Sequence, residues 1–364
     1  MKPRVFVVHP IPEEALDVMR EVAEVTVYPY TDRQITVDEL IANVKRTDYL
    51  FAMHETLVPA EVIDANPDLK GIGVLGGSSA FMDFTAAKAR GIPVVTSDPA
   101  DNLVPGGARQ TTADLTVGML VALAYRIVEA DRFTRRGNFK QEQTISMLGV
   151  GCYHKTVGLI GLGTVAEYMI PKLRAFDMDI AYTKRNRLSQ DGERELGVRW
   201  LPTIDDVMRQ SDFVCVQVTF NETTENLIGA RELALMKPTA YLINTGRAWT
   251  VNREALIAAL RRGTIAGAAL DVFWDEPPAT HQPAVPPELF KMENVILSPH
   301  NGDGTWDNRG SRTKSIAKGI VALIKGEQPA ELVDSDVNRA VFGTPHTYYY
   351  QGPGGAIGPT RRNG

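Results

Sequence analysis

The stretch Val157-Gly-Leu-Ile-Gly161-Leu-Gly163-Thr-Val-Ala166 decides the fold. Its first four residues predict a buried strand, and the segment after it has the pattern of a helix. Gly161 allows a tight turn, Gly163 lets the backbone approach a pyrophosphate, and Ala166 is small enough for the helix to pack on the strand. A helix N-terminus there offers amide donors and a positive dipole end. A glycine-rich turn alone can be purely structural, but a further strand about 20 residues on makes the pattern typical of dinucleotide binding.

The same alternation of strand and helix extends in both directions from this stretch. The strands expected in the second half of the chain are 157–160, 179–182, 213–218, 240–244, 267–271 and 295–297. Those expected in the first hundred residues are 5–8, 25–28, 49–53, 71–75 and 94–96. This order predicts an α/β protein with two doubly wound parallel sheets covered by helices.

The length of 364 residues predicts about two domains. We expect a dinucleotide-binding domain of the Rossmann type at 104–304, inserted into a flavodoxin-like substrate-binding domain. That second domain is discontinuous, since the helix expected at 311–325 has no core of its own; it covers 1–103 and 305–340. One long helix is expected at 111–136, and the Gly- and Pro-rich residues 341–364 are expected to form a tail.

The composition argues against several classes of function. The 39 basic and 44 acidic residues give a net charge of −5, which argues against a protein that grips nucleic acid by its phosphates. Cys152 and Cys215 are too few and too far apart for a disulfide framework or a cysteine metal cluster, so no metal is expected. No apolar run approaches the ~18 residues of a membrane span, and the N-terminus lacks a signal peptide. We therefore expect a cytoplasmic protein without membrane or nucleic-acid partners.

The residues after the expected strand 179–182 bear on the choice of dinucleotide. NAD-binding proteins place a carboxylate there for the ribose 2′-hydroxyl. This chain has Thr183-Lys184-Arg185-Asn186-Arg187, with three cations and no acid. The segment favours NADP with its 2′-phosphate over NAD, although NAD stays possible and a solvated basic turn is the alternative reading.

Three polar residues follow strand-like runs or lie a few residues beyond them: Arg247, Glu276 and His300. Ligands of open α/β sheets bind at the carboxyl ends of the strands, so these side chains could converge on one site. Each alone could be a surface cation, a loop carboxylate or a structural histidine. Together, and beside a dinucleotide turn, they form a coherent site for hydride transfer.

Four segments resemble the D-isomer-specific 2-hydroxyacid dehydrogenase family, namely 235–247, 254–260, 267–273 and 294–300. The resemblance implies that Arg247, Glu276 and His300 are the catalytic trio. It also implies that Asp271 contacts the nicotinamide carboxamide and that the Leu75-Gly76-Gly77 backbone helps bind the substrate carboxylate. The cofactor contacts expected are Gly161, Gly163, Thr164, Val165, Thr183, Lys184, Arg185, Thr245 and Asp271.

The function expected from these features is reduction of a small 2-oxo acid, such as glyoxylate or hydroxypyruvate, with NADP(H). Two alternatives stay open: an NAD-preferring enzyme acting on a bulkier 2-keto sugar acid, and a dinucleotide-sensing protein similar to a transcriptional co-repressor. The resemblance also implies a homodimer paired through the long helix at 111–136. The particular acid is not encoded in a recognisable motif.

Overall fold

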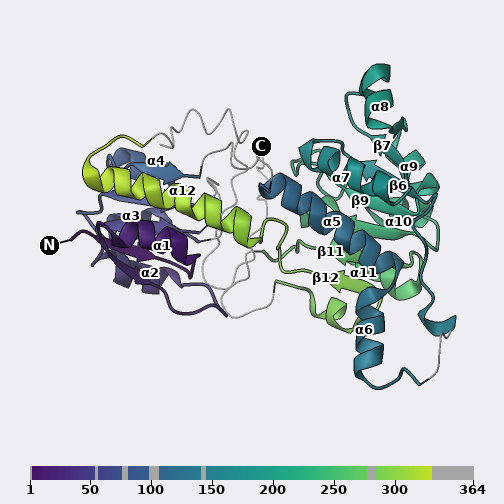
Figure 1. Ribbon diagram of the computed structural model, residues 1–364, viewed down its shortest axis with the longest axis horizontal. Helices are drawn as coiled ribbons and strands as arrows, with labels where there is room; N and C mark the ends of the chain where they lie inside the picture. Colours follow the sequence, from purple (N-terminus) through teal and green to yellow (C-terminus); the bar gives the residue numbers. More distant parts are fainter. Residues whose placement is uncertain are drawn as a thin grey trace, which may run out of the picture. The chain divides into compact units, whose positions relative to one another are not determined.

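The computed structural model describes residues 2–53, 56–75, 81–97, 106–140, 145–276 and 284–329. The chain divides into two compact units, whose elements are labelled in Figure 1. Unit 1 comprises Met1–Gly107, Pro277–Gln282 and Thr305–Gly364, and unit 2 comprises Ala108–Glu276 and Pro283–Gly304. The expected tail, 341–364, and most of the segment 98–107 lie outside the described residues.

Unit 1 is built on a five-stranded parallel sheet in the order β2-β1-β3-β4-β5. Its strands are β1 (Arg4–Val7), β2 (Glu24–Val27), β3 (Tyr49–Ala52), β4 (Gly71–Val74) and β5 (Val94–Thr96). Its helices are α1 (Glu13–Arg20), α2 (Val37–Val44), α3 (Ala60–Asp64), α4 (Phe84–Ala89) and α12 (Trp306–Lys325).

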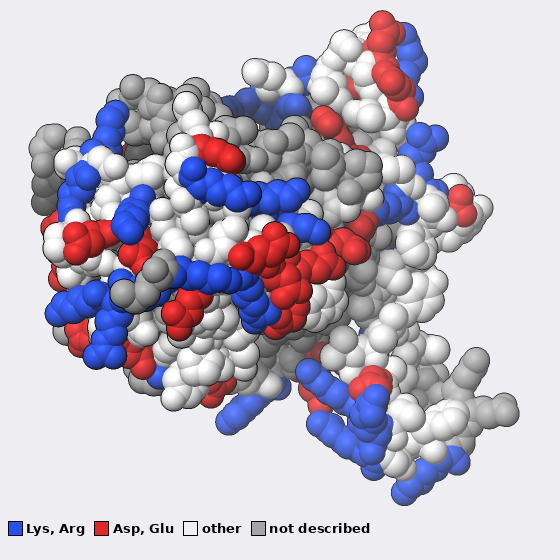
Figure 2. Space-filling view, turned by 60° about the vertical axis from the view of Figure 1, so that its left-hand side comes forward, with Lys and Arg blue, Asp and Glu red and all other residues white. Residues whose placement is uncertain are grey.

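Successive side chains along the strands of unit 1 point to opposite faces of the sheet, and a buried core forms on each face. Phe6 and Leu50 belong to one buried cluster, and Val5 and Phe51 belong to the other, which includes Ile316 of α12. The helix α12 therefore completes the core of the first hundred residues. Figure 2 shows Lys and Arg side chains beside Asp and Glu side chains at several places on one face of the molecule.

Unit 2 contains a seven-stranded parallel sheet in the order β12-β11-β10-β9-β6-β7-β8. Its strands are β6 (Thr156–Ile160), β7 (Asp179–Thr183), β8 (Arg199–Trp200), β9 (Phe213–Val216), β10 (Tyr241–Asn244), β11 (Gly267–Leu270) and β12 (Val295–Leu297). Its helices are α5 (Ala108–Ala124), α6 (Ile127–Arg135), α7 (Thr164–Ala175), α8 (Gln190–Leu196), α9 (Ile204–Gln210), α10 (Ala230–Leu235) and α11 (Arg253–Arg262). Two buried clusters again occupy the two faces. The predicted fold class, two parallel sheets covered by helices, is confirmed.

The single long helix expected at 111–136 is wrong: the chain forms α5 and α6, bent by 59°. The break falls at Arg126, whose φ of +51° is left-handed, and its guanidinium is paired with Glu129 in the first turn of α6. Within the described part of the chain, no single helix has the length and hydropathy to cross a membrane. The bent pair of α5 and α6 reaches that length and hydropathy only when the two helices are counted together.

Candidate active site

The carboxyl edge of the seven-stranded sheet gathers most of the predicted site residues. Because the strands are parallel, the residue after each strand lies on the same edge. The residues there are Gly161 after β6, Lys184 after β7, Arg247 beyond β10, Asp271 after β11 and His300 beyond β12. The strand order reverses between β6 and β9, which is the position where open α/β sheets bind ligands.

The turn between β6 and α7 has the geometry of a pyrophosphate cradle. Gly161 has φ +92°, and an added Cβ would lie 2.6 Å from the Gln217 carbonyl oxygen. A Cβ on Gly163, in contrast, would meet nothing within 4 Å, so open space adjoins this backbone. Thr164 and Val165 begin α7, whose N-terminal amides face the turn, and Ala166 is buried. These residues fit a bound dinucleotide.

Arg109 is a cradle residue that the sequence pattern does not reveal. Its Nη1 donates to Thr164 Oγ1 at 2.9 Å. The helices α5 and α7 run in parallel, since Asp114 further along α5 pairs with Lys172 further along α7 at 3.1 Å. Figure 1 shows the two helices side by side. The guanidinium thus lies at the positive end of α7, 55 residues before its partner in sequence, where no motif could indicate it.

The basic segment after β7 is only partly available to a phosphate. Arg187 pairs with Glu193 through Nε and Nη2, both at 2.8 Å, and this arginine lowers the pKa of Glu193 to about 2. Lys184 Nζ donates to the Leu162 carbonyl at 2.9 Å, which ties it to the cradle. Arg187 is thus paired with an acid, and the predicted contact Arg185 is exposed. Thr183 is buried, and its carbonyl accepts the Gly161 N–H.

Glu276 and His300 form the best-defined pair at this edge. A hydrogen bond of 2.7 Å joins His300 Nδ1 to Glu276 Oε2. The other oxygen, Oε1, accepts the Phe273 backbone N–H at 2.9 Å, which fixes the carboxylate. The Glu276 side chain is 13% exposed and that of His300 33% exposed. This is a carboxylate-oriented imidazole, an arrangement suited to general acid and base chemistry.

Arg247 occupies a turn that its neighbours hold in place. Asn244, the last residue of β10, accepts the Gly246 N–H and donates to the Arg247 carbonyl, both at 3.1 Å. The exposed guanidinium donates to the Gly246 carbonyl at 2.8 Å. Thr245 is buried, and its hydroxyl bonds to Thr116 at 2.7 Å and accepts from Gln217 at 3.1 Å. The structure brings Glu276 into contact with His300 and places Arg247 two strands away on the same edge.

The structure also shows the hydrogen bonds of Asp271 and Leu75, the predicted contacts of cofactor and substrate. Asp271 is buried and accepts backbone N–H groups from Asn301 and Gly302. Leu75 follows β4 in unit 1 and donates its N–H to the Ala52 carbonyl at 3.0 Å. A substrate-binding role for this segment would thus depend on Gly76 and Gly77, which lie outside the described residues.

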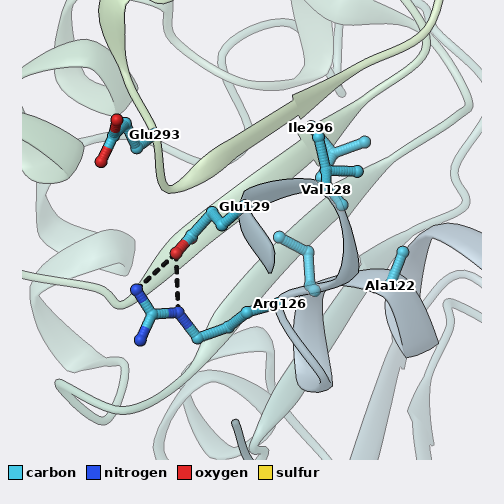
Figure 3. A pocket seen from close by; sticks show the side chains of 7 residues that line it. Ala122, Arg126, Val128, Glu129, Glu293 and Ile296 are labelled. Carbon is cyan, nitrogen blue, oxygen red and sulfur yellow. Dashed lines mark hydrogen bonds and ion pairs between the residues drawn. The ribbon is translucent and has the colours of Figure 1, made fainter. Parts of the chain in front are cut away.

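A small surface hollow lies at the bend between α5 and α6 (Figure 3), and none of the predicted site residues line it. Its lining includes Arg126, Glu129 and Glu293, and the Arg126–Glu129 ion pair closes one side. It lies at the helix bend and beside β12, which contributes Ile296 to its lining. Among the residues that the structure describes, no group of three or more His, Cys, Asp or Glu side chains is arranged to hold a metal ion.

Comparisons with known proteins agree with this geometry. Residues 117–302 match the family model of the D-isomer specific 2-hydroxyacid dehydrogenase NAD binding domain. Glyoxylate reductases of Thermococcus gammatolerans and Pyrococcus furiosus are 37% and 35% identical over 341 residues, 93% of this chain and 97% of each relative.

Solved structures give the same result. The NADPH-dependent glyoxylate/hydroxypyruvate reductase of Sinorhizobium meliloti has a TM-score of 0.70 at 27% identity, covering 91% of this chain and 98% of that one. The 2-hydroxyacid dehydrogenase of Ketogulonicigenium vulgare has a TM-score of 0.71 at 26% identity, covering 92% and 99%.

The sheet, the cradle and the carboxylate-oriented histidine define an oxidoreductase that binds a nicotinamide dinucleotide. The chain belongs to the D-isomer-specific 2-hydroxyacid dehydrogenase family.

Proposed function

We propose that the protein reduces a small 2-oxo acid, such as glyoxylate or hydroxypyruvate, to the D-2-hydroxy acid with NADPH. The observation that carries this proposal is the 2.7 Å bond between Glu276 and His300 on the sheet edge that also holds the cradle. When bound, the cofactor supplies the hydride. The remaining tasks, binding the acid and moving one proton, fall to three side chains of unit 2.

Arg247 binds the substrate carboxylate, because an exposed guanidinium can form two parallel hydrogen bonds with it. His300 gives a proton from Nε2 to the substrate carbonyl oxygen during reduction and takes one back during oxidation. Glu276 holds Nδ1, which sets the ring orientation and stabilises the imidazolium. Phe273 fixes Glu276 in turn through its backbone N–H.

The preference for NADP is supported by the end of β7. Residues 183–187 contain no carboxylate to accept a ribose 2′-hydroxyl, while exposed Arg185 offers a guanidinium to a 2′-phosphate. Arg109 and the α7 N-terminus would hold the pyrophosphate. The relative from S. meliloti is named as NADPH-dependent.

The experiment that tests the function follows nicotinamide absorbance with purified protein, NADPH or NADH, and a panel of 2-oxo acids. The expected result is turnover of glyoxylate or hydroxypyruvate, faster with NADPH. In His300→Ala the turnover number should fall by about 100-fold or more while NADPH still binds. Cofactor binding without turnover across the panel would instead favour a dinucleotide sensor, and faster turnover of sugar-derived acids with NADH would favour the bulkier substrate class.

We also propose a homodimer, supported by α6. This nine-residue helix has no buried residue within its unit, although it carries Ile127, Val128 and Phe133. A helix this short needs tertiary packing to persist. Further exposed apolar side chains lie beside it in sequence: Tyr125, Phe139, Ile145, Leu148 and Tyr153. A second copy of the chain would bury this surface.

Sedimentation of the purified protein tests the dimer. The wild-type chain should sediment at about twice its monomer mass, and the double variant Ile145→Asp with Leu148→Asp should shift toward the monomer. A wild-type monomer at working concentration would refute the proposal. We further propose that the protein works in the cytoplasm without membrane partners. The net charge of −5 supports the absence of a nucleic-acid partner.

A further inference from the structure

Thr116 is a buried hydroxyl on the face of α5 that packs against the sheet of unit 2. It is 0% exposed, and the buried residues around it on this helix are mostly apolar, among them Ala113, Val117 and Leu120. The helix packs against β10 and β11. A hydroxyl moved from water into such surroundings costs free energy unless it is hydrogen-bonded. Thr116 makes two hydrogen bonds, one within α5 and one to the residue that follows β10.

The donors and acceptors of these bonds leave one direction for the protons. Thr116 Oγ1 donates to the Thr112 carbonyl at 2.6 Å, because a carbonyl can only accept. The single hydroxyl proton of Thr116 is then used, so Thr245 donates in the 2.7 Å bond between the two hydroxyls. Thr245 Oγ1 in turn accepts from Gln217 Nε2 at 3.1 Å. The chain of hydrogen bonds thus runs from Gln217 through Thr245 and Thr116 to the backbone of α5.

Thr245 begins the turn that carries Arg247. The later part of this turn is held through the Arg247 carbonyl, which accepts from Asn244 at 3.1 Å and from the Thr250 hydroxyl at 2.7 Å. The Thr116 hydroxyl holds the start of the turn, from 129 residues away in sequence. A guanidinium pairs with a carboxylate through two parallel hydrogen bonds, so small displacements of its backbone decide whether both form. The bond from α5 therefore helps to fix where Arg247 meets a bound acid.

We infer that Thr116 is a positioning residue for substrate binding: its hydroxyl holds Thr245 and thereby sets the place from which Arg247 binds the carboxylate of the 2-oxo acid. The inference rests on the proposed role of Arg247. The proton-donating pair is held by a separate bond, which joins Glu276 to His300. Loss of the Thr116 hydroxyl should therefore weaken binding of the acid, while proton transfer to an acid already bound keeps most of its rate.

The test compares variants at this position in binding and in turnover. Thr116→Val keeps the shape of the side chain and removes the hydroxyl, whereas Thr116→Ser keeps the hydroxyl and removes a methyl group. We expect Thr116→Val to raise the KM for glyoxylate by about 5- to 20-fold with kcat within about threefold of the wild type. Thr116→Ser should restore KM to within about twofold. The inhibition constant of oxamate, a carboxylate that accepts no hydride, should rise with KM, and the NADPH dissociation constant from calorimetry should stay within about twofold.

A double-mutant cycle shows whether Thr116 acts through Arg247. In an Arg247→Gln background, Thr116→Val should change the oxamate constant by less than about twofold, because the guanidinium that it positions is already gone. Equal losses in both backgrounds would overturn the inference. Thr313→Val is the matched control: Thr313 is also fully buried on a helix, α12, and its hydroxyl donates to the carbonyl four residues earlier at 2.6 Å. The KM of this control should equal that of the wild type.

Two other results would overturn the inference while the proposed function stands. One is an active wild type with an unchanged KM in Thr116→Val; the other is an NADPH constant that rises as much as KM, since the hydroxyl would then serve the cofactor site. If Thr116→Val fails to fold, Thr116→Ala, which favours the helix, replaces it with the same expected rise in KM. If the wild-type protein turns over no 2-oxo acid, or Arg247→Gln binds oxamate as tightly as the wild type, the failure lies in the proposed function and the inference falls with it.

Discussion

Replacing Glu276 with glutamine should reduce kcat by about 10- to 100-fold. In the wild type the two carboxylate oxygens have separate partners, His300 Nδ1 at 2.7 Å and the Phe273 N–H at 2.9 Å. Glutamine has one acceptor oxygen. If that oxygen stays with Phe273, the amide NH₂ faces Nδ1 and opposes a protonated ring; if it turns to His300, the Phe273 N–H loses its partner.

The size of the effect follows from the charge on the imidazolium. Two unit charges about 4 Å apart attract by about 4 kcal/mol at an effective dielectric constant of 20. His300 is 33% exposed, so solvent weakens this attraction. Hydrogen bonds to charged groups are worth about 1.5–3 kcal/mol, and this range corresponds to about 10- to 100-fold in rate.

The assay is reduction of glyoxylate by NADPH over a range of pH. The loss should be greatest at high pH, where a proton-donating ring depends most on the nearby negative charge, and NADPH affinity should stay within about twofold. Asp275→Asn is the matched control, since Asp275 pairs with Arg253 at 2.9 Å and should be replaceable without loss of rate. A Glu276→Gln enzyme within threefold of the wild type at every pH would refute the reasoning.

Four further variants test the cradle and the segment after β7. Gly163→Ala should fold normally and bind NADPH at least tenfold more weakly, because its Cβ enters the open space beside the cradle. Gly161→Ala should instead lose about 2–4 kcal/mol of stability, because Gly161 has a positive φ and the added Cβ would lie 2.6 Å from the Gln217 carbonyl oxygen. Arg185→Gln should weaken NADPH binding by about tenfold and leave NADH binding unchanged. Glu193→Gln should destabilise the protein at pH 6, and its deficit should shrink as pH falls from about 4.5 toward about 2.

Each of these has a comparison that can contradict it. If calorimetry finds equal NADPH affinity in Gly163→Ala and in the wild type, the assignment of the cradle is wrong. Thermal unfolding measures the stability of the two glycine variants. Arg187→Gln is the control for Arg185, because its charge is already neutralised by Glu193. The pH dependence for Glu193 follows from its lowered pKa. The folded state favours the ionised carboxylate, so Glu193 adds to stability above its ordinary pKa of 4.5, and this contribution is lost as the pH falls toward about 2. Urea midpoints that differ equally at pH 6 and pH 3 would contradict this.

Much of the fold is predictable because its signals are local. The strand, the tight turn at Gly161 and the small Ala166 are all within ten residues, and β6 and α7 form where this pattern predicts them. The two-residue strand β8 is too short to have a periodic signal, and it forms because β7 offers a paired edge. The break at Arg126 is also invisible in the pattern, since an apolar run continues across it.

The site divides in a similar way. The sequence by itself placed Arg247, Glu276 and His300 beyond strand-like runs, and it placed three cations after β7. Only the tertiary structure decided that Arg187 pairs with Glu193, that Arg109 donates to Thr164, and that Asp271 accepts the Asn301 N–H beside His300. For the contacts of Arg109 and Asp271 the physical reason is distance along the chain. The pairs Arg109–Thr164 and Asp271–Asn301 are 55 and 30 residues apart, and the order of strands and the packing of helices bring them together.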